Sequence, residues 1–298
     1  MNCHSILSNN FGFSGVGTHS GLTSTVFVES APIGNGITFI RTDLGNSHIT
    51  ANVLNVKSTN ASTEISNGTC SVKTIEHLMS AFTAFNIFDA NVYIDNEEMP
   101  IMDGSAKLFV DMILEAGIQK SNNYDSMFIK RKVSVEHNGA ILSIEPSSML
   151  EFDIQLHMRS VSESTKICIS KSSYLRYIAS ARTFGFLSDE SKLRGLGLIK
   201  GVSLDNSLVL NDNGVPVNKG GFRLDNELIM HKVLDSVGDF GLIGMPVYGK
   251  ITGSPSHTLN NLLSRKILSL SSCFDIIGAD CMTNNTDFAV KKFANSFC

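Results

Sequence analysis

The pattern of apolar and polar positions along the chain alternates between the two-residue period of strands and the longer period of helices. Strands are predicted where β-branched residues alternate between turn-forming flanks, at 24–30, 36–43, 127–146, 150–158, near 206–210 and at the start of 91–106. Helices are predicted where apolar residues recur every three or four positions, at 74–85, 106–117, 171–185, 224–240 and about 256–270. We expect Thr74 to cap the first of these helices and Gly117 to end the second.

The order of these elements divides the chain into two parts. The stretch 119–126, with the sequence QKSNNYDS, is polar and rich in turn formers, and strands and helices occur on each side of it. The sequence therefore predicts an α+β fold of two similar halves, 1–122 and 126–298, each a β-sheet packed by helices. The last segment, 282–298, carries little pattern, and we expect it to be poorly ordered.

Composition narrows the class of protein. The chain has 298 residues, of which 42% are hydrophobic and 17% charged, so it can bury a sizeable core. The net charge of −4 and the lack of a basic cluster in the sequence argue against a nucleic-acid partner. No apolar run approaches the roughly 20 residues of a membrane-spanning helix, and the opening residues lack the features of a signal peptide. We therefore expect a cytoplasmic monomer without stable membrane insertion.

The cysteines are scattered and form no C-x-x-C pair, which is typical of reduced thiols in a cytosolic protein rather than of a zinc site. They are Cys3, Cys70, Cys168, Cys273, Cys281 and Cys298.

The segment 223–240 places ionisable groups at the edge of an apolar helical stripe. The stripe consists of Met230, Val233, Leu234 and Val237. Beside it lie His231, Asp235 and Asp239, each four residues from the last. Successive four-residue steps drift by only roughly 40° around a helix, so the imidazole and the two carboxylates project together. His231 and Asp235 are therefore candidate metal ligands.

Two other segments could complete a catalytic site. A catalytic zinc ion commonly has three protein ligands and one position for water, and His77 is a candidate third ligand, with Glu76 beside it as a general base. His257 is a candidate acid that Asp239 could orient. The spacing leaves ordinary alternatives open, because a histidine four residues before an aspartate occurs by chance, and a histidine before a helix is more often a capping or surface residue.

Seven motifs in order along the chain resemble the zinc-dependent UDP-3-O-acyl-N-acetylglucosamine deacetylase family of lipid A biosynthesis. They are SGVGTHSG at 14–21, TIEHLMSAF at 74–82, EMPIMDGSA at 98–106, ARTFGF at 181–186, GLIKGVSLDN at 197–206, HKVLDSVGD at 231–239 and SHTLNN at 256–261. The resemblance implies two similar α+β halves with the active site between them, and UDP-3-O-acyl-N-acetylglucosamine as the substrate.

The resemblance also implies a role for each matching residue. The ligands of one zinc ion would be His77, His231 and Asp235. Glu76 would be the general base for the water that attacks the acetamide carbonyl, and the Thr183 hydroxyl would stabilise the oxyanion. His257, oriented by Asp239, would stabilise charge or protonate the leaving amine. The products would be acetate and a free amine.

The resemblance further implies contacts to the rest of the substrate. His19 and Lys232 would lie near it, and Phe184 is a further candidate contact. Helix geometry places Lys232 roughly 100° around from His231, which predicts that it points away from the metal pair. An insert at about 187–215, rich in Leu, Ile and Gly, would line an apolar passage for the acyl chain.

The chain departs from the family pattern at positions that bear on substrate binding or folding. Ser254, beside an unusual Pro255, stands where the family usually has a lysine, and Met230 stands where it has an arginine. Leu156 replaces an aromatic residue that would stack on uracil, and FDA at 88–90 replaces an IDN turn. No departure affects a proposed ligand or Glu76, so the sequence predicts intact chemistry with altered recognition of UDP. A drifted non-catalytic homologue, or a zinc amidohydrolase with a changed substrate, stays open as an alternative.

Overall fold

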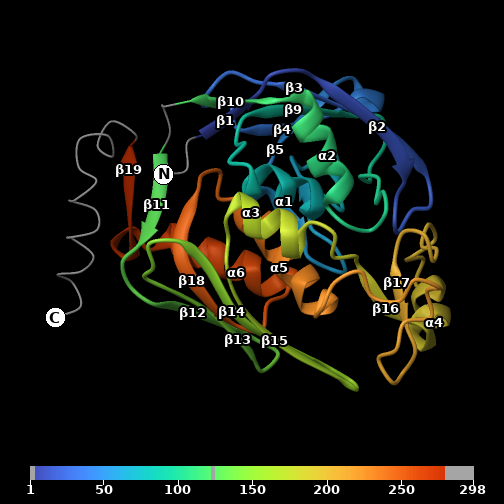
Figure 1. Ribbon diagram of the computed structural model, residues 1–298. Coiled ribbons are helices and arrows are strands. Elements are labelled where there is room, and N and C mark those ends of the chain that lie inside the picture. The colour runs from blue at the N-terminus through green and yellow to red at the C-terminus, as the bar shows by residue number, and fades with distance from the viewer. Residues whose placement is uncertain (1–3, 122–124, 279–298) are drawn as a thin grey trace.

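The computed structural model describes residues 4–121 and 125–278 (Figure 1). The tail at 282–298, for which we expect poor order, lies outside these residues, as do Cys3, Cys281 and Cys298. The other three cysteines, Cys70, Cys168 and Cys273, are free thiols as expected.

The strands of residues 4–121 pair only with one another among the described residues. The five-stranded sheet has the order β2-β3-β9-β4-β5, with a parallel β4/β9 pair among antiparallel neighbours. Its strands are β2 (Phe11–Val16), β3 (Thr23–Ser30), β9 (Ala90–Ile94), β4 (Ile37–Arg41) and β5 (Ser47–Thr50). The smaller sheets comprise β1 (His4–Leu7) with β10 (Ile118–Ser121), and β6 (Val56–Ser58), β7 (Glu64–Ser66) and β8 (Ser71–Val72).

Residues 125–278 form a seven-stranded sheet and a short parallel pair. The strand order of the large sheet is β12-β13-β18-β11-β19. In addition, β14 pairs with β18, and β15 pairs with β14. Its strands are β11 (Asp125–Ile129), β12 (Val133–His137), β13 (Ala140–Glu145), β14 (Leu150–Met158), β15 (Val161–Cys168), β18 (Val247–Gly253) and β19 (Phe274–Gly278). The parallel pair is β16 (Phe184–Phe186) with β17 (Leu208–Leu210).

The helices lie between the two large sheets, except for α4, which lies to one side beside the short pair of β16 and β17 (Figure 1). They are α1 (Glu76–Ala84), α2 (Lys107–Ala116), α3 (Lys171–Ser173) with a π-helical turn (Tyr174–Ile178), α4 (Glu190–Gly195), α5 (Glu227–Gly241) and α6 (His257–Ser269). Short 3₁₀ turns occur at Thr42–Leu44, Val53–Asn55, Leu187–Asp189 and Ser271–Cys273. The mixture of sheets and helices confirms the predicted α+β class.

The close contact of α1 with α5 joins the two parts of the chain. Both helices are buried on nearly all sides, which suits helices packed between layers. A Cβ atom at Gly238 would overlap the carbonyl oxygen of Glu76, and one at Gly241 would overlap the Thr83 hydroxyl. These glycines let the two backbones approach closely, which brings the side chains of α1 and α5 to one place.

Two local predictions are wrong. Thr74 does not cap α1: the capping position is Ile75, and the Thr74 hydroxyl instead donates to Glu98 at 3.0 Å. The helix expected at 171–185 ends after the π-helical turn at Ile178, because backbone N–H groups beyond it bond elsewhere. The N–H of Arg182 donates to Glu227, and that of Thr183 to the carbonyl of Gly104.

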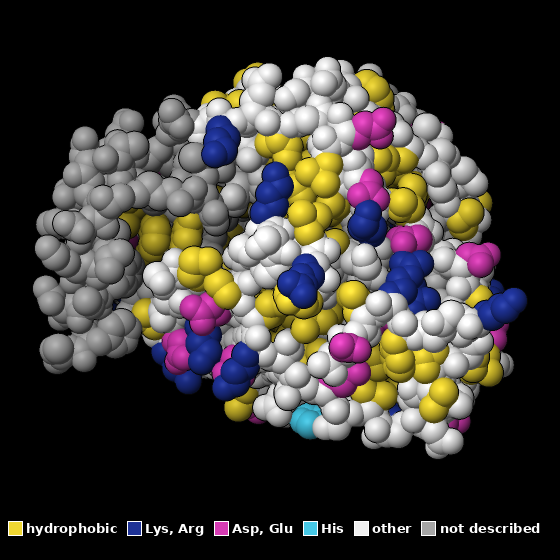
Figure 2. Space-filling view, viewed as in Figure 1, with side chains coloured by type: hydrophobic (Ala, Val, Ile, Leu, Met, Phe, Trp, Pro, Cys, Tyr) yellow, Lys and Arg dark blue, Asp and Glu magenta, His cyan; other side chains and the backbone are white. Residues whose placement is uncertain are grey.

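The surface agrees with the charge balance of the sequence. On the face shown in Figure 2, Lys and Arg side chains are interspersed with Asp and Glu. Within 4–121 and 125–278, no helix is both long and apolar enough to cross a membrane.

Candidate metal and active site

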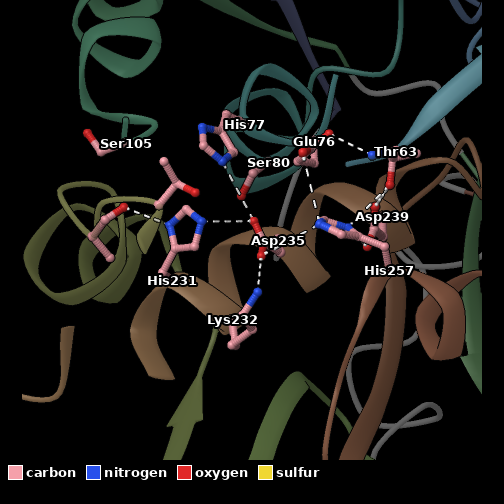
Figure 3. A network of polar contacts seen from close by, with 12 residues as sticks. Thr63, Glu76, His77, Ser80, Ser105, His231, Lys232, Asp235, Asp239 and His257 are labelled. Atoms are coloured by element: carbon pink, nitrogen blue, oxygen red, sulfur yellow. Dashed lines mark hydrogen bonds and ion pairs between the residues drawn. The ribbon is translucent and has the colours of Figure 1, made fainter. Parts of the chain in front are cut away.

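Three potential ligands converge on one point between α1 and α5 (Figure 3). His77 is the second residue of α1, and His231 and Asp235 occupy successive turns of α5. The Oδ1 atom of Asp235 lies 3.3 Å from Nε2 of His231 and 3.7 Å from Nε2 of His77. All three residues are buried, and the candidate donor atoms lie within 4.8 Å of one another.

The protonation states suit a divalent cation. Nδ1–H of His231 donates to the carbonyl of Ala181 at 3.0 Å, which leaves Nε2 as a lone pair directed at Asp235. Burial lowers the pKa of His231, and burial together with His231 lowers that of His77 to about 3, so both rings are neutral at pH 7. Asp235 Oδ1 is buried without a hydrogen-bond partner. Two ring nitrogens and an orphaned carboxylate oxygen therefore fit a metal of the zinc type.

Asp235 stays ionised although it is buried. Burial opposes its charged form, but His231, Lys232 and His257 favour it, and the pKa of Asp235 lies below its ordinary value. The second oxygen, Oδ2, accepts a hydrogen bond from Nζ of Lys232 at 2.9 Å. The prediction that Lys232 points away from the metal pair is wrong, because its flexible chain reaches back along α5 to the next turn.

Glu76 has the properties of a general base. It stands in the first turn of α1, directly before His77, and is 3% exposed. Burial raises its pKa to about 7, with Asp235 and Asp239 adding to the rise and His257 opposing it. A carboxylate whose pKa lies near neutrality can both take and release a proton at pH 7.

His257 and Asp239 form an oriented pair beside Glu76. Nδ1 of His257 lies 2.9 Å from Oδ2 of Asp239, and Nε2 lies 4.0 Å from Oε1 of Glu76. Burial disfavours the charged ring, but the charge and hydrogen bond of Asp239 outweigh it and raise the pKa of His257 to about 10. His257 is the first residue of α6, where Ser256 supplies the cap by accepting from the N–H of Leu259.

The sequence reasoning missed two residues of this cluster. The hydroxyl of Thr63, in the loop between β6 and β7, donates to Oδ1 of Asp239 at 2.6 Å. Nδ2 of Asn260 donates to Oδ2 of Asp239 at 2.9 Å. Asn260 lies within the SHTLNN motif, so its place in a matching segment was the available signal. Thr63 belongs to no motif that the sequence singled out.

A cavity of about 410 Å³ opens beside the cluster. Its lining includes His19, Glu76, His77, Thr183 and Phe184, together with apolar residues of 187–217: Leu187, Leu193, Leu198, Val202, Leu204, Val209 and Val217. The Phe184 ring also lies 6.1 Å from the ring of His231 and 5.4 Å from Nζ of Lys232.

Glu98 shapes the part of the cavity around His19, and the sequence reasoning missed it too. Its two carboxylate oxygens accept from the N–H groups of His19 and Ser20 at 2.8 and 2.7 Å. Burial lowers the pKa of His19, with Glu98 opposing, so the His19 side chain at the cavity wall is neutral at pH 7. Leu156 is 9% exposed and belongs to the hydrophobic core.

An α+β fold with two histidines and a carboxylate at one point, beside a buried glutamate, is typical of a metal-dependent hydrolase. Comparison with known proteins identifies the family. Residues 4–269 match the model of the UDP-3-O-acyl N-acetylglycosamine deacetylase family, and the chain belongs to this family.

Similar curated relatives carry the name UDP-3-O-acyl-N-acetylglucosamine deacetylase, and three of them show the extent of the similarity. The protein of Geobacter sp. (strain M21) is 40% identical over 91% of this chain and 90% of its own length. The protein of Acidithiobacillus ferrooxidans is 38% identical over 91% of this chain and 91% of its own length. The protein of Helicobacter pylori (strain ATCC 700392 / 26695) is 37% identical over 93% of this chain and 95% of its own length. The predicted family, and with it the deacetylase class of enzyme, is confirmed.

Proposed function

We propose that this protein hydrolyses the N-acetyl group of UDP-3-O-acyl-N-acetylglucosamine in lipid A biosynthesis, with one zinc ion held by His77, His231 and Asp235. The observation that carries the proposal is the orphaned, buried Oδ1 of Asp235 between two neutral imidazoles, next to Glu76. When bound, the metal supplies a Lewis acid that acidifies water and polarises a carbonyl oxygen.

The protein groups around this point have the chemistry that amide hydrolysis needs. Glu76 takes a proton from water as the water oxygen bonds to the acetamide carbon. The Thr183 hydroxyl, which lines the cavity, donates to the oxygen that becomes negative. His257, held protonated by Asp239, gives a proton to the nitrogen as the C–N bond breaks. Acetate and a free amine leave.

The cavity supports a binding mode for the rest of the substrate. We propose that the segment 187–215 lines an apolar passage for the acyl chain, since its leucines and valines share the cavity with Glu76 and His77. We also propose that Lys232, His19 and Phe184 contact the sugar or its phosphates. His19 and Phe184 line the cavity, and Nζ of Lys232 lies 5.4 Å from the Phe184 ring. Leu156 is buried, so uracil would have to be recognised by other groups than a ring at this position.

The division of the chain at about residue 123 into two domains belongs to the same proposal. It is supported by strands that pair within 4–121 or within 125–278 and not across that boundary among the described residues. A cytoplasmic location and a monomeric state are also proposed. Both suit an enzyme whose nucleotide-sugar substrate carries its acyl chain inside the protein.

The test is acetate release from UDP-3-O-acyl-N-acetylglucosamine by the purified full chain, after chelation and again after one equivalent of zinc. Activity that disappears with chelation and returns with zinc supports the proposal. A protein that binds zinc at this site but releases no acetate would favour a changed substrate or a non-catalytic homologue.

A further inference from the structure

One residue outside the proposed machinery contacts three of its members. Thr63 is 2% exposed and lies between β6 and β7 (Figure 3). Its backbone N–H donates to Oε2 of Glu76 at 3.1 Å, and its hydroxyl donates to Oδ1 of Asp239 at 2.6 Å. The same hydroxyl oxygen lies 3.3 Å from Nδ1 of His257.

The directions of these hydrogen bonds follow from which groups can donate. A carboxylate only accepts, so the single hydroxyl hydrogen of Thr63 is committed to Asp239. Nδ1 of His257 faces the other carboxylate oxygen at 2.9 Å and therefore carries a hydrogen, with the Thr63 oxygen as a second acceptor. Thr63 thus fixes both partners of the pair and the ring orientation in which Nε2 of His257 faces Glu76.

The contact also joins distant segments of the chain. Thr63 is separated by 176 residues from Asp239 and by 13 from Glu76. The Glu76 carboxylate and the His257 ring come from helices α1 and α6, so their 4.0 Å separation depends on groups that contact both. Thr63 makes such contacts with its backbone on one side and its side chain on the other.

We propose that Thr63 is a positioning residue of the reaction: it holds the base Glu76 and the Asp239–His257 pair in one fixed arrangement. The proposal rests on the proposed function for its kinetic consequence. Loss of the hydroxyl lets the Asp239 carboxylate and the His257 ring rotate, which lowers the rate of the chemical step more than the binding of substrate.

A matched control lies four residues away. The hydroxyl of Thr59 lies 2.8 Å from that of Thr258, so it also joins the β6–β7 loop to α6. Unlike Thr63, Thr59 makes no hydrogen bond to Glu76 or Asp239. Thr59→Val removes a bond between the same two segments without changing the partners of the proposed acid and base. Thr63→Ser retains the hydroxyl, and Thr63→Val removes it with little change of shape.

The first measurement is kcat and KM for acetate release. We expect Thr63→Val to lower kcat roughly 10- to 100-fold, the range found when a supporting hydrogen bond of a metal site is lost, with KM little changed. Thr63→Ser should retain most of kcat, and Thr59→Val should match wild type. An unchanged kcat in Thr63→Val, or an equal loss in Thr59→Val, would overturn the proposal.

The second measurement does not require turnover. In the full-length protein, the Nδ1 proton of His257 should give a low-field NMR signal in slow exchange with water, assigned by its absence in His257→Gln. The signal should persist in Thr63→Ser and Thr59→Val and be lost to exchange in Thr63→Val. Its absence from wild type, or its persistence in Thr63→Val, contradicts the proposal. A wild type that shows the signal but releases no acetate overturns the proposed function alone.

Discussion

Nδ1 of His231 lies 3.0 Å from the carbonyl oxygen of Ala181, and this hydrogen bond directs the opposite ring nitrogen to Asp235. The segment that precedes Thr183 therefore orients the ring as the metal ligand that we propose it to be. We expect His231→Gln to weaken zinc binding by more than about 100-fold, beyond the usual effect of losing only a supporting hydrogen bond. Competition with a chelating dye measures the affinity, and His48→Gln, at an exposed histidine, is the control. Equal affinities of the two variants would show that zinc binds elsewhere.

The Asp239–His257 pair predicts a pH dependence. Because Asp239 raises the pKa of His257 to about 10 against the opposing effect of burial, the ring stays protonated through the neutral range. As an acid it loses activity when the pH rises through that pKa. Asp239→Asn removes the negative charge, so the alkaline limb of the pH–rate profile should move to lower pH. If the alkaline limb of Asp239→Asn stays at the wild-type pH, a group other than His257 produces that limb.

The buried ion pair of Arg182 with Glu227 predicts an effect on stability. Nε of Arg182 lies 2.7 Å from Oε1 of Glu227, whose side chain has no exposed surface. Glu227→Gln leaves the guanidinium without its charged partner, and we expect a loss of roughly 3–5 kcal/mol in the free energy of unfolding. In Glu190→Gln, which breaks an exposed pair with Arg194, the change should stay within about 1 kcal/mol. Denaturant unfolding of both variants measures the difference.

The pKa of Glu227 predicts how the loss of stability in Glu227→Gln changes with pH. Burial alone would raise the pKa of Glu227, but hydrogen bonds from Arg182 and from backbone groups outweigh it, and the pKa lies below its ordinary value of 4.5. The stabilisation is therefore fully present above that ordinary value and is lost as the pH falls through the folded-state pKa. The gap between wild type and Glu227→Gln should narrow in acid. A gap that widens there would contradict this assignment.

The approach of α1 to α5 depends on Gly238. Its added Cβ in Gly238→Ala would overlap the Glu76 carbonyl, so we expect a loss of roughly 1–3 kcal/mol in stability, as for other overpacked sites. Because the displaced backbone carries Glu76, acetate release should also fall in protein that is still folded. Gly195→Ala, in α4 with open space around the glycine, should be neutral or slightly stabilising. Thermal unfolding and turnover together check both variants.

Periodicity predicted the helix α5 and the common direction of His231 and Asp235, because a four-residue spacing fixes direction within one helix. It misplaced Lys232, since a long flexible side chain is not confined to the direction of its Cβ. The strand β15 was not predicted. Its alternating positions are only half-buried, and it is held by pairing with β14, which no local pattern reports.

Contacts between distant segments were beyond the reach of local patterns. The helix expected through Thr183 stopped early because backbone donors there bond to Gly104 and Glu227, which lie far away in sequence. Thr63 was missed for the same reason, since its partner Asp239 is 176 residues away. The resemblance to a known family supplied what spacing could not, namely that His77 belongs with the pair on α5.

The central claim is that Glu76 moves the proton while His77, His231 and Asp235 hold the metal. The most direct test is to measure zinc content and acetate release in Glu76→Ala. We predict that zinc remains at one per chain, as in wild type, while turnover falls by roughly 10²–10⁴, the usual contribution of a general base. Turnover close to that of wild type, in protein that retains its zinc, would contradict the assignment of Glu76 as the base.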